Sequence, residues 1–231
     1  MFSISHISTH DGMSGAGKSA FKLFKTMDKK SFKNKMVVLN KHTKNPNVVC
    51  AKNLLPMYIK ILGIFLIIIH RVLNKLLSKN LHNFSIGIFP GLGHFLNKIL
   101  QSDIYIIRWT QGGFVQISDL LKLNRPIILV LSDECNMTGG CHYSGTCQNF
   151  KKDCIKCPEL SFFKNTIAYK SQLKKKEVVK TLKNLTVVSP SVWLTKRVKS
   201  SSIFRETRVL TINTGVDHTI FRPYDLIISR N

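Results

Sequence analysis

Short apolar runs alternate along the chain with longer segments in which apolar residues recur every three or four positions. The short runs predict buried strands, and the longer segments predict amphipathic helices. The predicted strands are residues 2–7, 36–39, 103–107, 127–131, 185–188 and 209–212. Because segments of helical length separate most of them, we expect an α/β fold with a mostly parallel sheet and flanking helices.

The first predicted strand leads into a glycine-rich turn. Residues 12–19 satisfy the pattern of a phosphate-binding loop, and Asp133 follows the strand at 127–131 like the aspartate that holds magnesium in such enzymes. These two features suggest a nucleotide kinase or ATPase. The first strand, however, is polar at five positions between 3 and 9, whereas a central strand buried on both faces is nearly all apolar. The turn therefore favours phosphate binding at a helix N-terminus over ATP hydrolysis.

The most apolar segment, residues 54–77, is interrupted by Lys60 and by the pair His70-Arg71. Its longest uninterrupted apolar stretch is well short of the ~20 residues that span a bilayer. The segment therefore predicts an amphipathic helix. Two places for this helix stay open, against the sheet as part of the core or at a membrane surface, and a transmembrane helix is a third, less favoured alternative.

Four of the six cysteines, Cys141, Cys147, Cys154 and Cys157, are bunched in one predicted loop. Only the last two have the spacing typical of a zinc knuckle, so a structural zinc site and a set of reduced, packed thiols are both compatible with the pattern. His142, beside the cluster, is either a further ligand or a donor to a loop carbonyl, and the second alternative is favoured. The bunching does not match a secreted disulfide framework and the N-terminus has no signal-peptide pattern, so we expect a cytoplasmic location.

Basic residues strongly outnumber acidic ones, with 35 Lys and Arg against 12 Asp and Glu and a net charge of +23. Such a surface attracts phosphate-bearing partners, among them anionic lipid headgroups and nucleotide substrates. A lysine bias spread over every solvated face, without a specific partner, is an equally weighted alternative. The lysine-rich regions at 18–44 and 151–183 lack the interleaved aromatic residues that stack on bases. Nucleic acid is therefore not an expected partner.

Several short motifs follow one another along nearly the whole chain. They are Ser14-Gly15-Ala16-Gly17, Trp109 with Gly112-Gly113-Phe114, Leu131-Ser132-Asp133, Thr138 to Tyr143, Cys154 to Pro158, Pro190 to Leu194, and Asn213 to Pro223. In residues and in order they resemble the N-terminal half of bacterial family 4 glycosyltransferases, the GT-B enzymes that build exopolysaccharide and lipopolysaccharide. Several collinear motifs are more specific than one phosphate-loop match, so this resemblance outweighs the kinase alternative.

The resemblance implies a Rossmann-like acceptor-side domain at 1–212 and the start of an interdomain hinge at 213–231, with the donor-binding C-terminal domain absent. It implies transfer of a hexose from a nucleotide-diphosphate sugar to a lipid-linked or polysaccharide acceptor in cell-surface glycan synthesis. The donor is a substrate, and neither a cofactor nor a catalytic metal is expected. The enzyme would be cytoplasmic, with peripheral contact to the anionic inner face of the membrane.

The resemblance also implies site residues. Those expected to bind substrate are Gly15, Ala16, Gly17, Arg108, Trp109, Gly112 and Gly113. Asp133 is expected at the reaction centre together with Ser132. Ser132 and Arg108 stand where the family has histidines, and a serine hydroxyl, unlike an imidazole, is not a base at pH 7 without help. A non-catalytic remnant that binds a membrane or a partner chain is therefore a further alternative.

Overall fold

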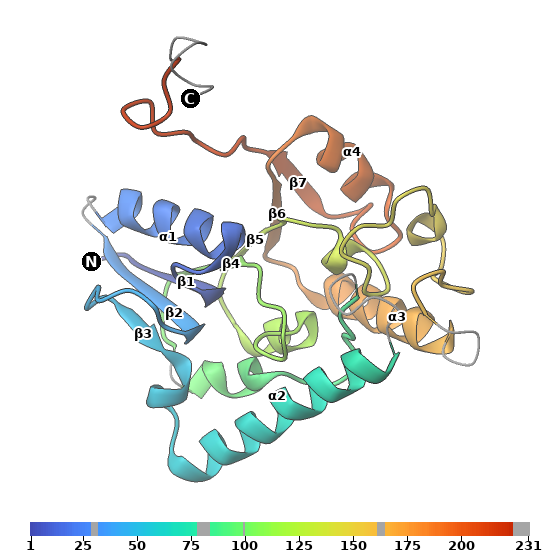
Figure 1. Cartoon of the computed structure of the whole chain (residues 1–231), viewed down its shortest axis with the longest axis horizontal. Coiled ribbons are helices and arrows are strands. Elements are labelled where there is room, and N and C mark those ends of the chain that lie inside the picture. The colour runs from blue at the N-terminus through green and yellow to red at the C-terminus, as the bar shows by residue number, and fades with distance from the viewer. Residues whose placement is uncertain (29–31, 78–83, 99, 161–164, 224–231) are drawn as a thin grey trace, which may run out of the picture.

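The structure is a computed structural model that describes residues 1–28, 32–77, 84–98, 100–160 and 165–223. Within these residues, seven parallel strands form one sheet in the order β3-β2-β1-β4-β5-β6-β7 (Figure 1). The strands are β1 (Ser3–His10), β2 (Lys33–Asn40), β3 (Val48–Cys50), β4 (Ile104–Arg108), β5 (Ile127–Val130), β6 (Leu185–Ser189) and β7 (Arg208–Thr211). The expected α/β fold, Rossmann-like with a parallel sheet, is confirmed.

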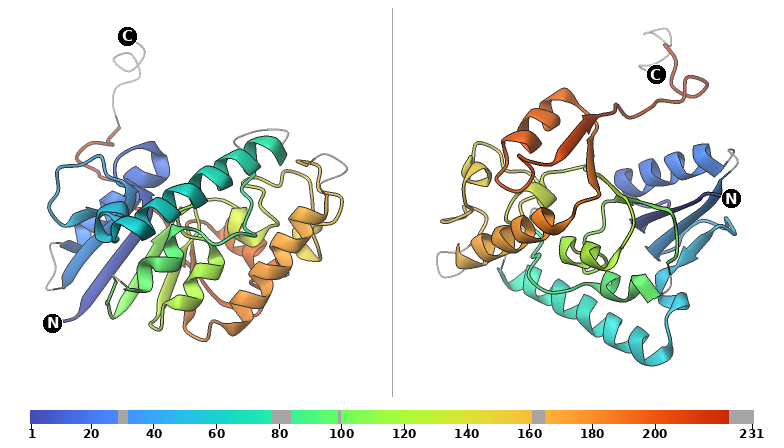
Figure 2. Two further views of the ribbon diagram at one scale, coloured as in Figure 1. Left: turned by 90° about the horizontal axis from the view of Figure 1, so that it is seen from below. Right: turned by 180° about the vertical axis from the view of Figure 1, so that it is seen from behind.

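Helices cover both faces of this sheet (Figures 1 and 2). They are α1 (Ser14–Asp28), α2 (Met57–Leu77), α3 (Asn165–Thr181) and α4 (Val192–Ser200). On one face, Phe24 of α1 packs with Met36 and Val38 of β2. The alternate residues of β2, Val37 and Leu39, belong to the larger core that also takes residues from α2, α3 and α4. This division follows from the alternation of side chains along a strand.

The strand order reverses at β1, which pairs with β2 on one side and with β4 on the other. The connection after β1 runs to β2, and the connection after β4 runs the opposite way to β5. Parallel sheets open a crevice between the carboxyl ends of two such strands, and ligands of open α/β folds bind there. The fold thus places the residues after β1, β4 and β5 at the position where a site is expected.

The chain after β7 leaves the sheet. Residues 213–223 are exposed and contain no helix or strand, and they run away from the sheet in Figure 1. Residues 224–231, the rest of the expected hinge region at 213–231, lie outside the described residues. The division into a domain at 1–212 and a hinge therefore stays a prediction.

Four residues of the central strand β1 are both polar and buried: Ser5, His6, Ser8 and Thr9. The Ser5 hydroxyl hydrogen-bonds that of Ser102 at 2.7 Å, and the Thr9 hydroxyl donates to the carbonyl oxygen of Gln111 at 3.0 Å. The His6 ring packs edge-on against Phe24, with the ring centres 5.7 Å apart. Burial lowers the pKa of His6 from 6.5 to about 4, so this side chain is buried in its neutral form.

We expect His6→Leu to make the free energy of unfolding less dependent on pH between 4 and 6.5. In that range unfolded His6 is protonated and folded His6 is not, so acidification favours unfolding by up to about 1.4 kcal/mol per pH unit. Urea unfolding at several pH values measures this slope. The exposed His94 provides the control, because His94→Gln should leave the slope unchanged. An equal slope in wild type and His6→Leu would contradict the prediction.

Candidate functional site

The turn after β1 is short, because α1 begins only four residues after β1 ends. Asp11 fixes this turn against the loop after β2: its carboxylate accepts hydrogen bonds from the backbone of His42 at 2.7 Å and of Thr43 at 2.9 Å. Burial alone would raise the pKa of Asp11, but hydrogen bonds from Thr43 and His42 hold it below its ordinary value. The turn is therefore pinned by a charged carboxylate.

Gly15, Ala16, Gly17 and Lys18 lie within α1, which begins at Ser14. A phosphate-binding loop of the kinase type wraps its glycines around the phosphates before the helix starts, so the structure does not form that loop. Gly17 has a packing role instead, because a Cβ there would lie 3.0 Å from the Cβ of His10 and 3.1 Å from its carbonyl oxygen. Gly15 faces open space.

Arg108 ends β4 but points toward α1, where its guanidinium donates to the hydroxyl of Ser19 at 2.9 Å. Burial lowers the pKa of Arg108. Arg108 therefore connects β4 to α1. It does not lie among the residues around Asp133, although the sequence predicted both residues for one substrate site.

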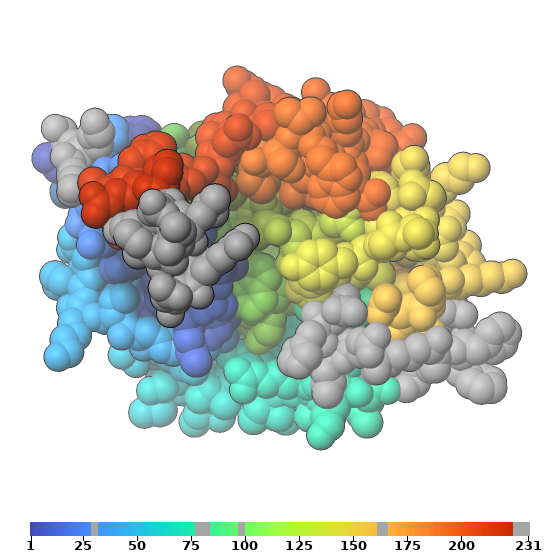
Figure 3. All heavy atoms as spheres, turned by 45° about the horizontal axis from the view of Figure 1, so that its top comes forward, coloured from blue at the N-terminus to red at the C-terminus, as the bar shows by residue number. Residues whose placement is uncertain are grey.

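A cleft of about 400 Å³ lies beside the ends of β4 and β5. Its lining residues come from five parts of the chain: Asn74, Phe84, Ser85, Trp109, Gln111, Gly112, Asp133, His142 and Tyr143. In the space-filling view, green atoms of the central part of the chain lie recessed between blue N-terminal atoms and yellow atoms of the cysteine-rich segment (Figure 3). The cleft brings together Trp109, Gly112 and Asp133, which the sequence predicted as site residues.

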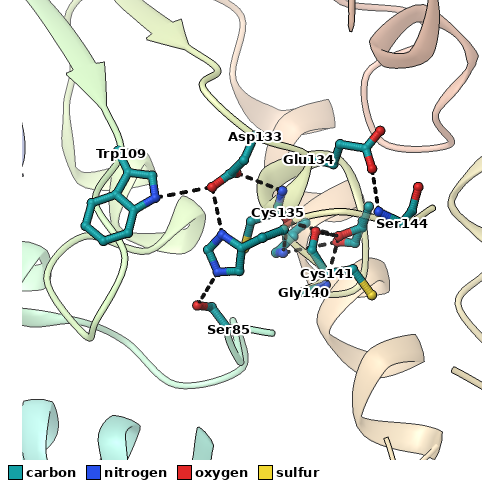
Figure 4. Close-up of polar contacts among 11 residues, drawn as sticks. Ser85, Trp109, Asp133, Glu134, Cys135, Gly140, Cys141 and Ser144 are labelled. Atoms are coloured by element: carbon teal, nitrogen blue, oxygen red, sulfur yellow. Dashed lines mark hydrogen bonds and ion pairs between the residues drawn. The ribbon is translucent and has the colours of Figure 1, made fainter. Parts of the chain in front are cut away.

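Asp133 is the centre of a hydrogen-bond network in this cleft (Figure 4). Its Oδ2 accepts from Nδ1 of His142 at 2.7 Å and from the indole nitrogen of Trp109 at 3.2 Å. Its Oδ1 accepts from the backbone nitrogen of Cys135 at 3.0 Å. On the other side of the imidazole, Nε2 of His142 lies 2.8 Å from the hydroxyl oxygen of Ser85.

This arrangement fixes how His142 can act. A carboxylate facing Nδ1 holds the proton on that nitrogen and leaves Nε2 as the basic one. The expectation that His142 donates to a loop carbonyl is therefore wrong, because its ring contacts the Asp133 carboxylate and the Ser85 hydroxyl. His142 with Asp133 can accept a proton from a hydroxyl group bound in the cleft.

Ser132 is exposed and does not line the cleft. The imidazole beside Asp133 comes instead from His142, nine residues further along the chain, in the segment after the strand. The sequence offered one signal for this residue, its place within the motif from Thr138 to Tyr143. Nothing in the spacing showed that the loop turns back to the aspartate.

The glycine pair after β4 divides into two roles. Gly112 and Gly113 have φ values of +78° and +80°, in the region that favours glycine. A Cβ on Gly113 would lie 3.1 Å from the Cα of Ile67 and from the Cβ of His70, so this residue lets the turn pack against α2. Gly112 has open space around it and lines the cleft. Of the two, Gly112 lies at the cleft and Gly113 lies against α2.

The four bunched cysteines line one small apolar cavity and carry free thiols. The sulfurs of Cys141 and Cys157 are 3.8 Å apart, and this contact lowers the pKa of Cys157 to about 7 while raising that of Cys141. Over the described ranges of the chain, no three or more His, Cys, Asp or Glu side chains are arranged as metal ligands. The zinc site thus stays a prediction.

Polar contacts that the sequence did not predict hold the segment carrying His142. The ammonium group of Lys175 in α3 is buried and donates to the carbonyl oxygens of Cys135 at 2.7 Å and Thr138 at 3.1 Å. The guanidinium of Arg197 in α4 forms an ion pair with Glu134, whose carboxylate also accepts from the backbone of Ser144 at 2.6 Å. The segment is therefore fixed from two helices.

We expect Lys175→Met to destabilise the protein by about 2 kcal/mol or more. Methionine keeps most of the apolar stem but leaves two buried carbonyl oxygens without their donor, and each such loss costs about 1–3 kcal/mol. Denaturant unfolding measures the change. Lys180 in the same helix is exposed, so Lys180→Met should change stability by less than about 0.5 kcal/mol. Equal effects of the two substitutions would refute the anchoring role of Lys175.

Comparison of the chain with protein-family models, with curated proteins and with solved structures finds no match in any of the three.

Proposed function

We propose that this chain supplies the acceptor side of a sugar-transfer site, in which a hexose passes from a nucleotide-diphosphate sugar to a hydroxyl group of a glycan or lipid-linked acceptor. The observation that carries the proposal is the Asp133–His142 pair in a cleft at the carboxyl ends of the central strands. The series of motifs that resembles family 4 glycosyltransferases supports the same chemistry. The proposal includes a cytoplasmic location, which the sequence predicted.

In the proposed reaction, Nε2 of His142 takes the proton from the acceptor hydroxyl. The acceptor oxygen forms a bond to the anomeric carbon of the donor, the bond from that carbon to the diphosphate breaks, and the nucleoside diphosphate leaves. Asp133 holds the proton of His142 on Nδ1, so that Nε2 is unprotonated, and it stabilises the imidazolium that forms. The hydroxyl of Ser85 lies 2.8 Å from Nε2, so in the proposed reaction it would turn away and the acceptor hydroxyl would take its place.

The donor would approach from the β1 side of the cleft. The ring of His10, at the end of β1, stacks with that of Trp109 at 6.2 Å between centres, which puts the glycine-rich turn and the cleft side by side. Gly15 is open to solvent in the first turn of α1, where backbone amides and the helix dipole favour an anionic diphosphate. Transfer requires that both substrates are held in this one region.

A second candidate function rests on the same atoms. Ser85, His142 and Asp133 form the hydrogen-bonded series of a serine hydrolase, with a hydroxyl next to an imidazole next to a carboxylate. Against it, the backbone nitrogen of Ser85 is already hydrogen-bonded to the carbonyl oxygen of Gly140 at 2.9 Å. That amide is then not free to stabilise an oxyanion beside the nucleophile. Labelling of Ser85 by a fluorophosphonate would favour the hydrolase.

The proposal is tested by incubating the chain with nucleotide-diphosphate sugars and lipid-linked or polysaccharide acceptors and following release of the nucleoside diphosphate. The chain is assayed alone and together with the product of the reading frame immediately downstream. Acceptor-dependent release that requires Asp133 supports sugar transfer. If no nucleoside diphosphate is released in either assay, the proposal is contradicted and a non-catalytic binding protein is favoured. ATP binding that is abolished by Lys18→Ala would favour a kinase.

A further inference from the structure

The outward side of α2 is an apolar surface along most of the length of the helix. Its residues follow helical spacing and have side chains between 46% and 72% exposed: Met57, Tyr58, Ile61, Leu62, Phe65, Ile68 and Val72. We call this set the α2 stripe. Apolar surfaces of this extent are uncommon on proteins without a partner at that face. The stripe is therefore a candidate interaction surface.

The opposite side of α2 packs on the domain. Ile59, Ile67 and His70 are buried there, and the His70 ring hydrogen-bonds the carbonyl oxygen of Pro90 at 3.1 Å. The expectation that this helix packs against the sheet as part of the core is thus met on one side of it, and the membrane expectation stays open for the other side. Figures 1 and 2 show α2 lying along the edge of the molecule, with its axis along the surface.

By length and composition alone α2 could cross a bilayer, since its stretch from Met57 to Leu76 has a mean hydropathy of 1.7. Crossing would require the helix to leave the domain, break the His70 contact and carry Lys60 and Arg71 into the hydrocarbon. A helix that lies flat keeps all these contacts. The stripe therefore suits the interface between lipid headgroups and acyl chains.

The charged residues of α2 indicate which partner suits the stripe. The helix carries Lys60, Arg71 and Lys75 and has no Asp or Glu between Met57 and Leu77. A second copy of the chain, also with a net charge of +23, would place like charges together, whereas an anionic bilayer supplies both apolar contact and opposite charge. We propose that the α2 stripe docks the protein on the surface of a bilayer containing anionic phospholipid, with α2 parallel to that surface.

This docking would place the cleft near the lipid. Asn74, near the end of α2, lines the cleft, and its side-chain oxygen accepts from the backbone nitrogen of Ile86 at 2.9 Å, next to Ser85. A lipid-linked acceptor would reach His142 by extending its head group from the bilayer past the end of α2. Delivery of such an acceptor rests on the proposed function, but attachment to the bilayer does not.

The test is co-sedimentation of the full chain, without any substrate, with vesicles of phosphatidylglycerol and phosphatidylcholine. We expect Phe65→Glu and Ile68→Glu each to lower the vesicle partition coefficient at least about tenfold, and added salt to weaken binding. The matched control is Val192→Glu in α4, because Val192 is 62% exposed and Phe65 is 58% exposed. Circular dichroism and thermal melting establish that all three variants are folded.

Each outcome decides the proposal. Binding to anionic vesicles that is lost in the α2 variants and kept in Val192→Glu supports it. No binding, equal binding to vesicles of phosphatidylcholine alone, or an equal loss in Val192→Glu would overturn it. A dimer in light scattering that dissociates on Phe65→Glu would assign the stripe to a second copy instead. Because no substrate is present, these results stand whether or not sugar transfer is observed.

Discussion

We expect His142→Gln to lower the turnover number for sugar transfer by about 10²–10⁴-fold, the usual range for loss of a general base. Glutamine can keep a hydrogen bond to Asp133, but its amide cannot accept the proton of the acceptor hydroxyl. Asp133→Asn should act in the same direction, because an amide can no longer hold the proton of His142 on Nδ1. Steady-state release of nucleoside diphosphate measures both effects.

Ser132→Ala is the matched control for these two variants. Ser132 is next to Asp133 in the sequence but is exposed and outside the cleft, so we expect its removal to change the turnover number less than about threefold. A loss with Ser132→Ala as large as with His142→Gln would restore the serine that the sequence motif suggested and would contradict the assignment of the base to His142.

The second large effect is expected for Gly140→Ala, which should destabilise the protein by about 3 kcal/mol or more. Gly140 has a φ of +148°, and a Cβ there would lie 2.6 Å from the carbonyl oxygen of Ser85 and 2.6 Å from Cζ of Phe84. An unfavourable backbone conformation costs about 1–3 kcal/mol, and overpacking costs a similar amount. Denaturant unfolding gives the value, and the shift of the neighbouring His142 should lower transfer as well.

Gly145→Ala separates the two causes of this effect. Gly145 also has a positive φ, +53°, but a Cβ there would meet nothing within 4 Å. We therefore expect only the backbone cost, on the order of 1 kcal/mol. If Gly140→Ala costs no more than Gly145→Ala, then the close approach between Gly140 and Ser85 does not hold the two segments together.

The alternation of apolar runs and helical segments was sufficient to predict the parallel sheet, because strands buried on both faces are short and apolar and their crossovers need helices. The edge strand β3 was missed, since it is only three residues long and lies at the edge of the sheet beside β2. The polar β1 was harder to interpret. Ser3, Ser5 and Thr9 bond to partners about 100 residues away, which no local pattern contains.

The candidate site was predicted in part, for the same physical reason. Asp133, Trp109 and Gly112 follow strands, and the ends of parallel strands meet at one edge of the sheet. His142 and Ser85 reach the site by long-range pairing, since Phe84 forms an isolated bridge with Cys141. Arg108 and Trp109 were predicted together, but adjacent side chains diverge at the end of β4: Arg108 points to α1 while Trp109 points to the cleft.

The most direct measurement of the central claim, that Asp133 and His142 act as one proton-accepting unit, is a double-mutant cycle on sugar transfer. The wild type, Asp133→Asn, His142→Gln and the double variant are compared by turnover number at saturating substrates. Residues that act as a unit give non-additive losses, so the double variant should be no slower than the slower single variant. Losses that multiply would show that the two residues act independently and would contradict the account.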